Sequence, residues 1–110
     1  MVDAQMFRQA WGKFATGVSI ITTVEPDGQV HGMAANGIAS VSLDPLLVLF
    51  CVGHNRNSYP LVRATRRFAI SILNEDQRPI AEYYTRPPEK RTGDVEISFR
   101  FTESGAAVID

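Results

Sequence analysis

Small and polar residues gather in two stretches of the chain that could line a ligand pocket. The first is Gly32-Met-Ala-Ala-Asn-Gly37, which is followed by Ser40, Val41 and Ser42. Small side chains let a flat ligand approach the backbone, and an amide and hydroxyls can form hydrogen bonds with its polar edge. The same composition is also typical of a β-bulge or a hairpin corner, so both interpretations stand at this stage.

The second stretch, Asn55-Arg-Asn-Ser58, lies between an apolar run and a short predicted helix. Backbone N–H groups and the positive dipole end at a helix start attract phosphate, and Arg56 adds a positive charge. Plain N-capping by Asn57 or Ser58 is the alternative. Together the two stretches predict one pocket, with a slot for a planar ring beside an anion site. A flavin nucleotide is one ligand that fits this description.

The common catalytic templates are absent from the sequence. There is no GxSxG, GxxxxGK[ST], GxGxxG or HExxH motif. His31, His54 and Cys51 do not have the spacing of a metal site. Cys51 lies in the apolar run 46–52, where we expect an inert, buried thiol. We therefore predict no catalytic side chain and no metal ligand.

The elements that must position these residues follow from periodicity. Apolar residues at 7, 10, 11 and 14 predict an amphipathic helix that Asp3 caps and that ends before Gly17. Further helices are predicted over 58–64 and 74–84, and strands over 18–24, 29–35, 38–43, 46–52 and 68–73, with a weak one around 97–101. The run 46–52 is apolar throughout, so we expect it to be covered on both faces. Because helical crossovers do not fit between the first four strands, we expect a mainly β, antiparallel, barrel-like sheet with peripheral helices.

Length and charge narrow the function classes. The chain has 110 residues, 11 Lys+Arg and 12 Asp+Glu, a net charge of −1, so we expect one domain over residues 1–110 and no binding of nucleic acid or membrane. An OB-like barrel for nucleic-acid or protein contacts would need a basic, aromatic face, and only 9% of residues are aromatic. No apolar run approaches the roughly 18–20 residues of a membrane span, and we expect a cytoplasmic protein.

Six motifs in order resemble the flavin reductase-like family with its FMN-binding split β-barrel fold. They are Phe14-Ala-Thr-Gly-Val18, His31-Gly-Met-Ala-Ala-Asn36, Ser40-Val-Ser-Leu-Asp-Pro45, the apolar run 46–52, Asn57-Ser58 and Phe68-Ala-Ile-Ser-Ile-Leu73. The resemblance runs from about residue 6 to residue 84 and loosely on to Asp110. The family includes the small reductase components of two-component monooxygenases.

The resemblance implies an NAD(P)H-dependent flavin reductase, which transfers a hydride from NADH or NADPH to FMN or FAD. The cofactor carries this chemistry, which agrees with the absence of catalytic templates. It further implies a homodimer and a monooxygenase that receives the reduced flavin. In the family, the flavin ring and phosphate lie against positions that correspond here to Met33, Ala34, Ala35, Asn36, Ser40, Val41, Ser42, Asn57 and Ser58. His31 is interpreted as a surface hairpin residue, with a place at the flavin edge as the alternative.

Two departures from the family pattern have consequences for these expectations. Ala35 stands where many members carry a threonine, so one hydroxyl contact is lost. Members usually continue beyond the stretch that resembles Glu103–Val108 with further strands that complete the barrel, and we expect these strands to be missing here. The alternative function is therefore a flavin carrier or sensor module without efficient reductase activity.

Overall fold

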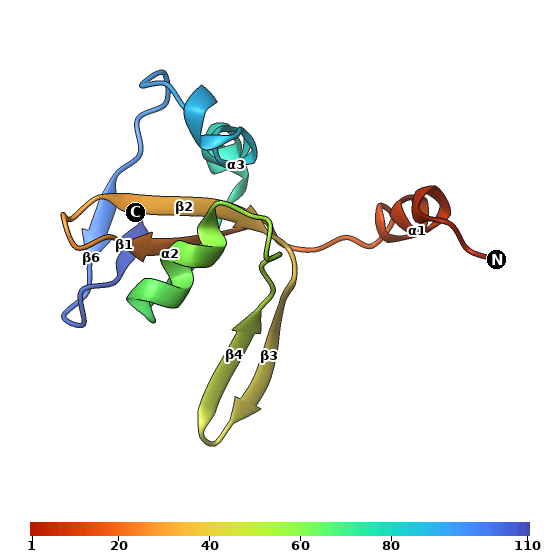
Figure 1. Cartoon of the computed structure of the whole chain (residues 1–110), viewed down its shortest axis with the longest axis horizontal. Coiled ribbons are helices and arrows are strands. Elements are labelled where there is room, and N and C mark those ends of the chain that lie inside the picture. Colours follow the sequence, from red (N-terminus) through yellow and green to blue (C-terminus); the bar gives the residue numbers. More distant parts are fainter.

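A three-stranded antiparallel sheet forms the centre of the molecule, which the computed structural model describes over residues 1–110. Strand β1 (Ser19–Val24) lies between β2 (Val30–Ala35) and β5 (Ala69–Ile72). Figure 1 shows β1 beside β2. Its β-branched side chains suit a strand that is paired along both edges. Ile20 and Ile21 are fully buried and form the core of the chain.

A tight turn joins β1 to β2 and sets the register of the hairpin. Gly28 takes a φ of +89°, which glycine adopts without strain, and the Asp27 carboxylate accepts a hydrogen bond from the Gln29 N–H at 3.0 Å. The predicted hairpin is confirmed, with Ser19 opposite Ala35 and Val24 opposite Val30.

Two helices cover opposite faces of β2. Consecutive residues of a strand point to opposite faces, and His31 contacts Ser58 of α2 (Ser58–Thr65), whereas Gly32 packs against Tyr84 of α3 (Arg78–Thr85). The one-turn helix η1 (Glu75–Gln77) leads into α3. The predicted capping box opens it, with the Gln77 side chain accepting a hydrogen bond from the Asn74 N–H at 2.9 Å.

Strands β3 (Ile38–Leu43) and β4 (Leu46–Phe50) form a hairpin that projects from the central sheet (Figure 1). The alternation predicted for 38–43 gives this strand, with a register irregularity between Ser40 and Ser42. The prediction that the apolar run 46–52 is covered on both faces was wrong: Leu46 to Leu49 are exposed in the chain. A continuous apolar run shows that a strand has no polar face, but not which element covers it, and here β4 pairs only with β3.

The N-terminal helix α1 (Ala4–Trp11) stands apart from the sheet at the end of an extended segment (Figure 1). Asp3 caps it as predicted, since its carboxylate accepts a hydrogen bond from the Met6 N–H at 2.8 Å. The helix ends at Trp11 with Gly12 as its C-cap, earlier than expected, and none of its residues is buried. No helix of the chain is both long enough and apolar enough to span a membrane.

The C-terminal segment contains the short helix η2 (Pro88–Lys90) and a two-stranded sheet of β6 (Phe99–Phe101) and β7 (Ala107–Ile109). Strand β7 was not predicted. It is held by the Thr22 hydroxyl, which donates to the Ala107 carbonyl, and by the Ser71 hydroxyl, which accepts from the Ile109 N–H. The fold is thus mainly β with peripheral helices and antiparallel pairing, as predicted, but its three separate sheets do not form a closed barrel.

Candidate functional site

A cavity of about 670 Å³ opens beside the free edge of β2. Its floor is the segment His31–Gly37, without Gly32 among the lining residues. One wall is the loop from Cys51 to Ser58 at the start of α2, and the other is the segment from Tyr84 to Arg91 at the end of α3. The volume lies within the range of about 300–1,000 Å³ that small-ligand sites occupy.

The floor presents backbone hydrogen-bonding groups to the cavity. The Gly32 carbonyl points away from β1, because it accepts a hydrogen bond from Arg91 Nη1 at 2.9 Å. Residues two apart in a strand direct their backbone groups to the same side, so the N–H and C=O of Ala34 also point outward. Ala34 lines the cavity and has only a methyl side chain. A flat ligand can therefore reach one donor and one acceptor in the plane of the sheet.

Gly32 allows α3 to approach the floor closely. A Cβ atom at this position would lie 2.5 Å from the Tyr84 ring, closer than any packing contact allows. Tyr84 is 7% exposed, and burial, with Tyr83 beside it, raises the pKa of its phenol to about 12. The phenol is therefore neutral at physiological pH.

Arg91 joins the α3 wall to the floor. Its guanidinium lies 5.1 Å from the centre of the Tyr84 ring and donates to the Tyr84 carbonyl at 3.1 Å, besides the bond to Gly32. Burial lowers the pKa of Arg91, but an arginine keeps its charge in proteins. A fixed positive charge thus stands in the wall.

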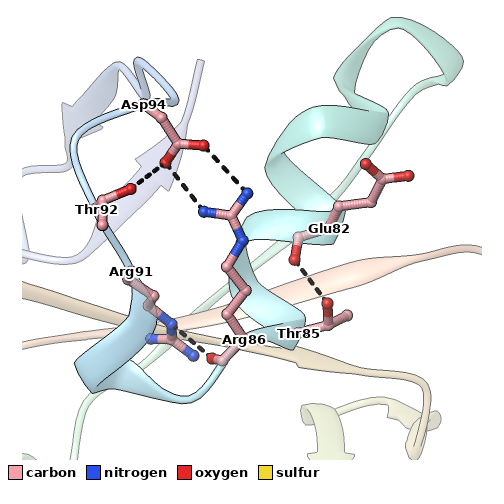
Figure 2. Close-up of polar contacts among 6 residues, drawn as sticks. All are labelled: Glu82, Thr85, Arg86, Arg91, Thr92 and Asp94. Atoms are coloured by element: carbon pink, nitrogen blue, oxygen red, sulfur yellow. Dashed lines mark hydrogen bonds and ion pairs between the residues drawn. The ribbon is translucent and has the colours of Figure 1, made fainter.

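The segment after α3 is held by a two-point ion pair. Arg86 Nη1 and Nη2 donate to the two Asp94 carboxylate oxygens at 3.0 and 3.1 Å, and the Thr92 hydroxyl donates to the same carboxylate at 2.7 Å (Figure 2). These hydrogen bonds, from Arg86 first, lower the pKa of Asp94 to about 2. Figure 2 also shows Arg91 Nε donating to the Arg86 carbonyl. Asp94 therefore neutralises Arg86, whereas Arg91 binds carbonyls only.

His31 and Ser58 connect the floor to the α2 wall. The His31 Nε2 lies 2.8 Å from the Ser58 hydroxyl, and Ser58 is 5% exposed. Burial, and then the charge of Arg91, lower the pKa of His31, so the imidazole is neutral at physiological pH. Nε2 of a neutral imidazole either accepts a hydrogen bond from the Ser58 hydroxyl or donates one to it, depending on the tautomer. The prediction of a surface histidine was wrong, because His31 is half-buried and lines the cavity.

The start of α2 leaves polar groups available to a ligand. Asn57 is the N-cap residue, but its side chain makes no capping hydrogen bond. The Arg56 side chain lies near Gly53, where a Cβ atom would be 3.4 Å from its Cγ. Arg56, Asn57 and Ser58 all line the cavity.

The structure brings six of the nine predicted flavin-binding residues together in one cavity. It places Met33, Ala34, Ala35 and Asn36 on the floor and Asn57 and Ser58 on the wall of one cavity. Ser40, Val41 and Ser42 lie outside it, on β3, because the chain turns away from β2 after Gly37. Ser40 borders a separate apolar hollow with Ile70 and Ile72, and the Ser42 hydroxyl accepts a hydrogen bond from the Asp44 N–H at 3.2 Å.

Sequence reasoning missed the α3 wall, which includes Tyr84, Arg86 and Arg91. A glycine inside a strand pattern is a signal of close backbone approach, so Gly32 indicated that a large side chain packs there, although not which one. Cys51 was expected to be buried, but it is exposed and lines the cavity, because β4 ends at Phe50.

The cavity has the chemistry of an anion site with a flat floor. Its charged lining residues are Arg56, Arg86 and Arg91, and no aspartate or glutamate lines it. The chain has no cluster of three or more His, Cys, Asp or Glu residues that could hold a metal ion. The lining therefore suits a planar ligand with a phosphate group, and it does not suit a cationic ligand.

Comparisons with known proteins agree with this description. Residues 11–110 match the flavin reductase like domain family. The reductase subunit HsaB of a flavin-dependent monooxygenase from Mycobacterium tuberculosis is 36% identical over 110 residues, which are 99% of this chain and 57% of that protein.

Solved structures of similar proteins have the same fold. Nitrilotriacetate monooxygenase component B from Mycobacterium thermoresistibile gives a TM-score of 0.84 at 39% identity, over 96% of this chain and 57% of that one. The NADH:FAD oxidoreductase SgcE6 from Streptomyces globisporus, in complex with NAD and FAD fragments, gives 0.83 at 31% identity, over 99% and 66%. The chain thus spans less than two thirds of the length of these proteins.

Proposed function

Because the chain belongs to the flavin reductase like domain family, we propose that its cavity binds FMN or FAD and that the protein is an NAD(P)H-dependent flavin reductase. The observation that carries this proposal is the cavity itself. A floor of small side chains and outward backbone groups meets two arginine-bearing walls, and no carboxylate side chain lines the cavity between them.

The residues present fit a flavin nucleotide. The outward N–H and C=O of Ala34 suit the alternating carbonyl and N–H groups on the polar edge of the ring, and the Asn36 amide adds a further donor and acceptor. Arg56, Asn57 and Ser58 at the start of α2 suit the ribityl phosphate. Ser40, Val41 and Ser42 stay a prediction from the family resemblance, without support from the cavity.

When bound, the flavin supplies the redox chemistry by accepting a hydride from NADH or NADPH. The side chains of this chain have positioning roles. Neutral His31 holds the Ser58 hydroxyl in place, and Arg91 with Tyr84 fixes the second wall. We propose no nucleophile and no general base. A monooxygenase that consumes the reduced flavin is the partner that the names of the similar proteins support.

We also propose that the fold is a split β-barrel. We further propose that a second copy of the chain covers the hairpin β3–β4. The exposure of Leu46, Leu47 and Leu49 in the single chain supports a homodimer, since exposed apolar side chains that gather on one element are a common sign of an interface. A monomer by light scattering at micromolar concentration would contradict it. A cytoplasmic location stays a prediction from the sequence.

Flavin titration tests the proposed function. We expect FMN or FAD fluorescence to be quenched on addition of the protein, and NADH or NADPH to be oxidised once flavin is present. Binding without oxidation would favour the flavin carrier or sensor. No spectral change with either flavin would contradict both functions.

A further inference from the structure

Arg91 carries a positive charge in the cavity wall without a carboxylate partner. Its Nε, Nη1 and Nη2 donate to three main-chain carbonyls, at 3.0, 2.9 and 3.1 Å, which belong to Arg86, Gly32 and Tyr84. The ion pairs of the chain, within 4.0 Å, join other residues, namely Arg78–Glu82, Arg86–Asp94 and Arg100–Asp110. A carbonyl accepts a hydrogen bond but does not neutralise the charge.

The guanidinium also has donors left over. It has five N–H groups, and the three carbonyls use one on each nitrogen. One N–H therefore remains on Nη1 and one on Nη2. The carbonyls and the Tyr84 ring, 5.1 Å away, hold the group in place, so these two donors keep a fixed direction. N–H groups of a guanidinium that are held in this way can donate to the oxygens of a phosphate.

Holding three carbonyls does not use all that the Arg91 side chain offers. A side-chain amide has only two N–H donors, so the three carbonyls need a guanidinium, but they leave its charge and two of its N–H groups unpaired. Keeping a half-buried guanidinium without an anion costs free energy, because burial removes part of its hydration. No acidic side chain lines the cavity, and Glu89, whose charge opposes the lowering of the Arg91 pKa, forms no ion pair with Arg91. An anionic ligand group would offset this cost.

We propose that Arg91 recognises a phosphate group of the nucleotide bound in the cavity, from the wall formed by the end of α3. This inference rests on the proposed function, since flavin and nicotinamide nucleotides both carry phosphate. It adds a second recognition point to the one at Arg56, Asn57 and Ser58. Those residues belong to the other wall of the cavity.

The test compares phosphorylated and unphosphorylated ligands in Arg91→Gln. One arm measures the dissociation constants of FMN and riboflavin, and the other those of NADH and reduced nicotinamide riboside. We expect the preference for the phosphorylated ligand to fall about 10-fold in at least one arm, and that arm identifies the source of the phosphate. Arg78→Gln is the matched control, because it removes the same charge from an exposed ion pair outside the cavity. Unchanged preferences in both arms would overturn the proposal.

A second measurement does not depend on the variant or on flavin binding. The Arg91 Nε–H resonance of the unaltered protein is followed by NMR during a titration with inorganic pyrophosphate. We expect this resonance to shift more than that of Arg78. If flavin does not bind but Arg91 responds, the proposed function is wrong and the anion site stands. If Arg91 does not respond, the proposal is wrong even where flavin binds.

Discussion

Replacing Gly32 by alanine tests the close contact between β2 and α3. The added Cβ would lie 2.5, 2.8 and 3.0 Å from three atoms of the Tyr84 ring. Tyr84 cannot rotate away freely, because it is 7% exposed and Arg91 lies over its ring. The substitution should therefore push α3 and its wall away from the cavity floor.

The size of the effect follows from the number of short contacts. Overpacking a core costs about 1–3 kcal/mol, and three ring atoms at or below 3.0 Å place Gly32→Ala in the upper half of that range, about 2–3 kcal/mol of unfolding free energy. For a domain of this size, each kcal/mol corresponds to a change in Tm of about 4–8 °C. Weaker FMN binding should accompany the loss of stability.

Urea unfolding of four variants separates this cause from others. Gly93→Ala is the matched control, since a Cβ there has no atom within 4 Å, and we expect a change below about 0.5 kcal/mol. In a cycle with Tyr84→Ala, the double variant should be no less stable than Tyr84→Ala alone, because removing the ring makes room for the methyl group. Additive effects, or a Gly32→Ala protein as stable as the unaltered one, would refute the reasoning.

Three further predictions concern single side chains. Asn36→Ala should weaken FMN binding by about 5- to 10-fold in a fluorescence titration, because an amide hydrogen bond is lost. Cys51→Ala should change the affinity less than about 2-fold. Equal effects of the two substitutions would show that the flavin does not bind where we propose. Because the pKa of His31 is lowered in the folded protein, the unfolded chain binds more protons just below pH 6.5, and the stability of the protein falls as the pH falls through this window. The Tm of the His31→Gln variant should therefore fall less between pH 7 and pH 5 than that of the unaltered protein. The same pH profile in both proteins would contradict the assignment. The pKa of Asp94 is about 2 in the folded protein, so the contribution of this carboxylate to stability is present above pH 3.8 and is lost as the pH falls toward 2. Unfolding of the Asp94→Asn variant, followed by circular dichroism, should depend less on pH in this range. A steeper dependence would argue against the ion pair with Arg86.

Local signals in the sequence were sufficient for most of the helices and strands, although not for β7, and for the floor of the site. Asp3, the turn at Gly28 and the Asn74–Gln77 capping box act over three or four residues, so spacing alone predicts them. The floor segment Met33–Asn36 was recognisable for the same reason, because small residues inside a strand pattern are unusual.

Contacts between distant segments decided the rest. Arg91 reaches Gly32 across 59 residues, and Thr22 reaches Ala107 across 85, and no periodicity records such pairings. The exposure of β4 likewise depends on where the hairpin turns after Gly37, not on its own composition.

The sequence by itself thus determined most of the strands and helices, the small-residue floor and the family, since each depends on neighbouring residues or on their order. Only the tertiary structure decided that His31 is half-buried beside Ser58, that Ser40 to Ser42 lie outside the cavity, and that Arg91 stands in its wall. The physical reason is that burial and charge pairing depend on which distant groups become neighbours when the chain folds.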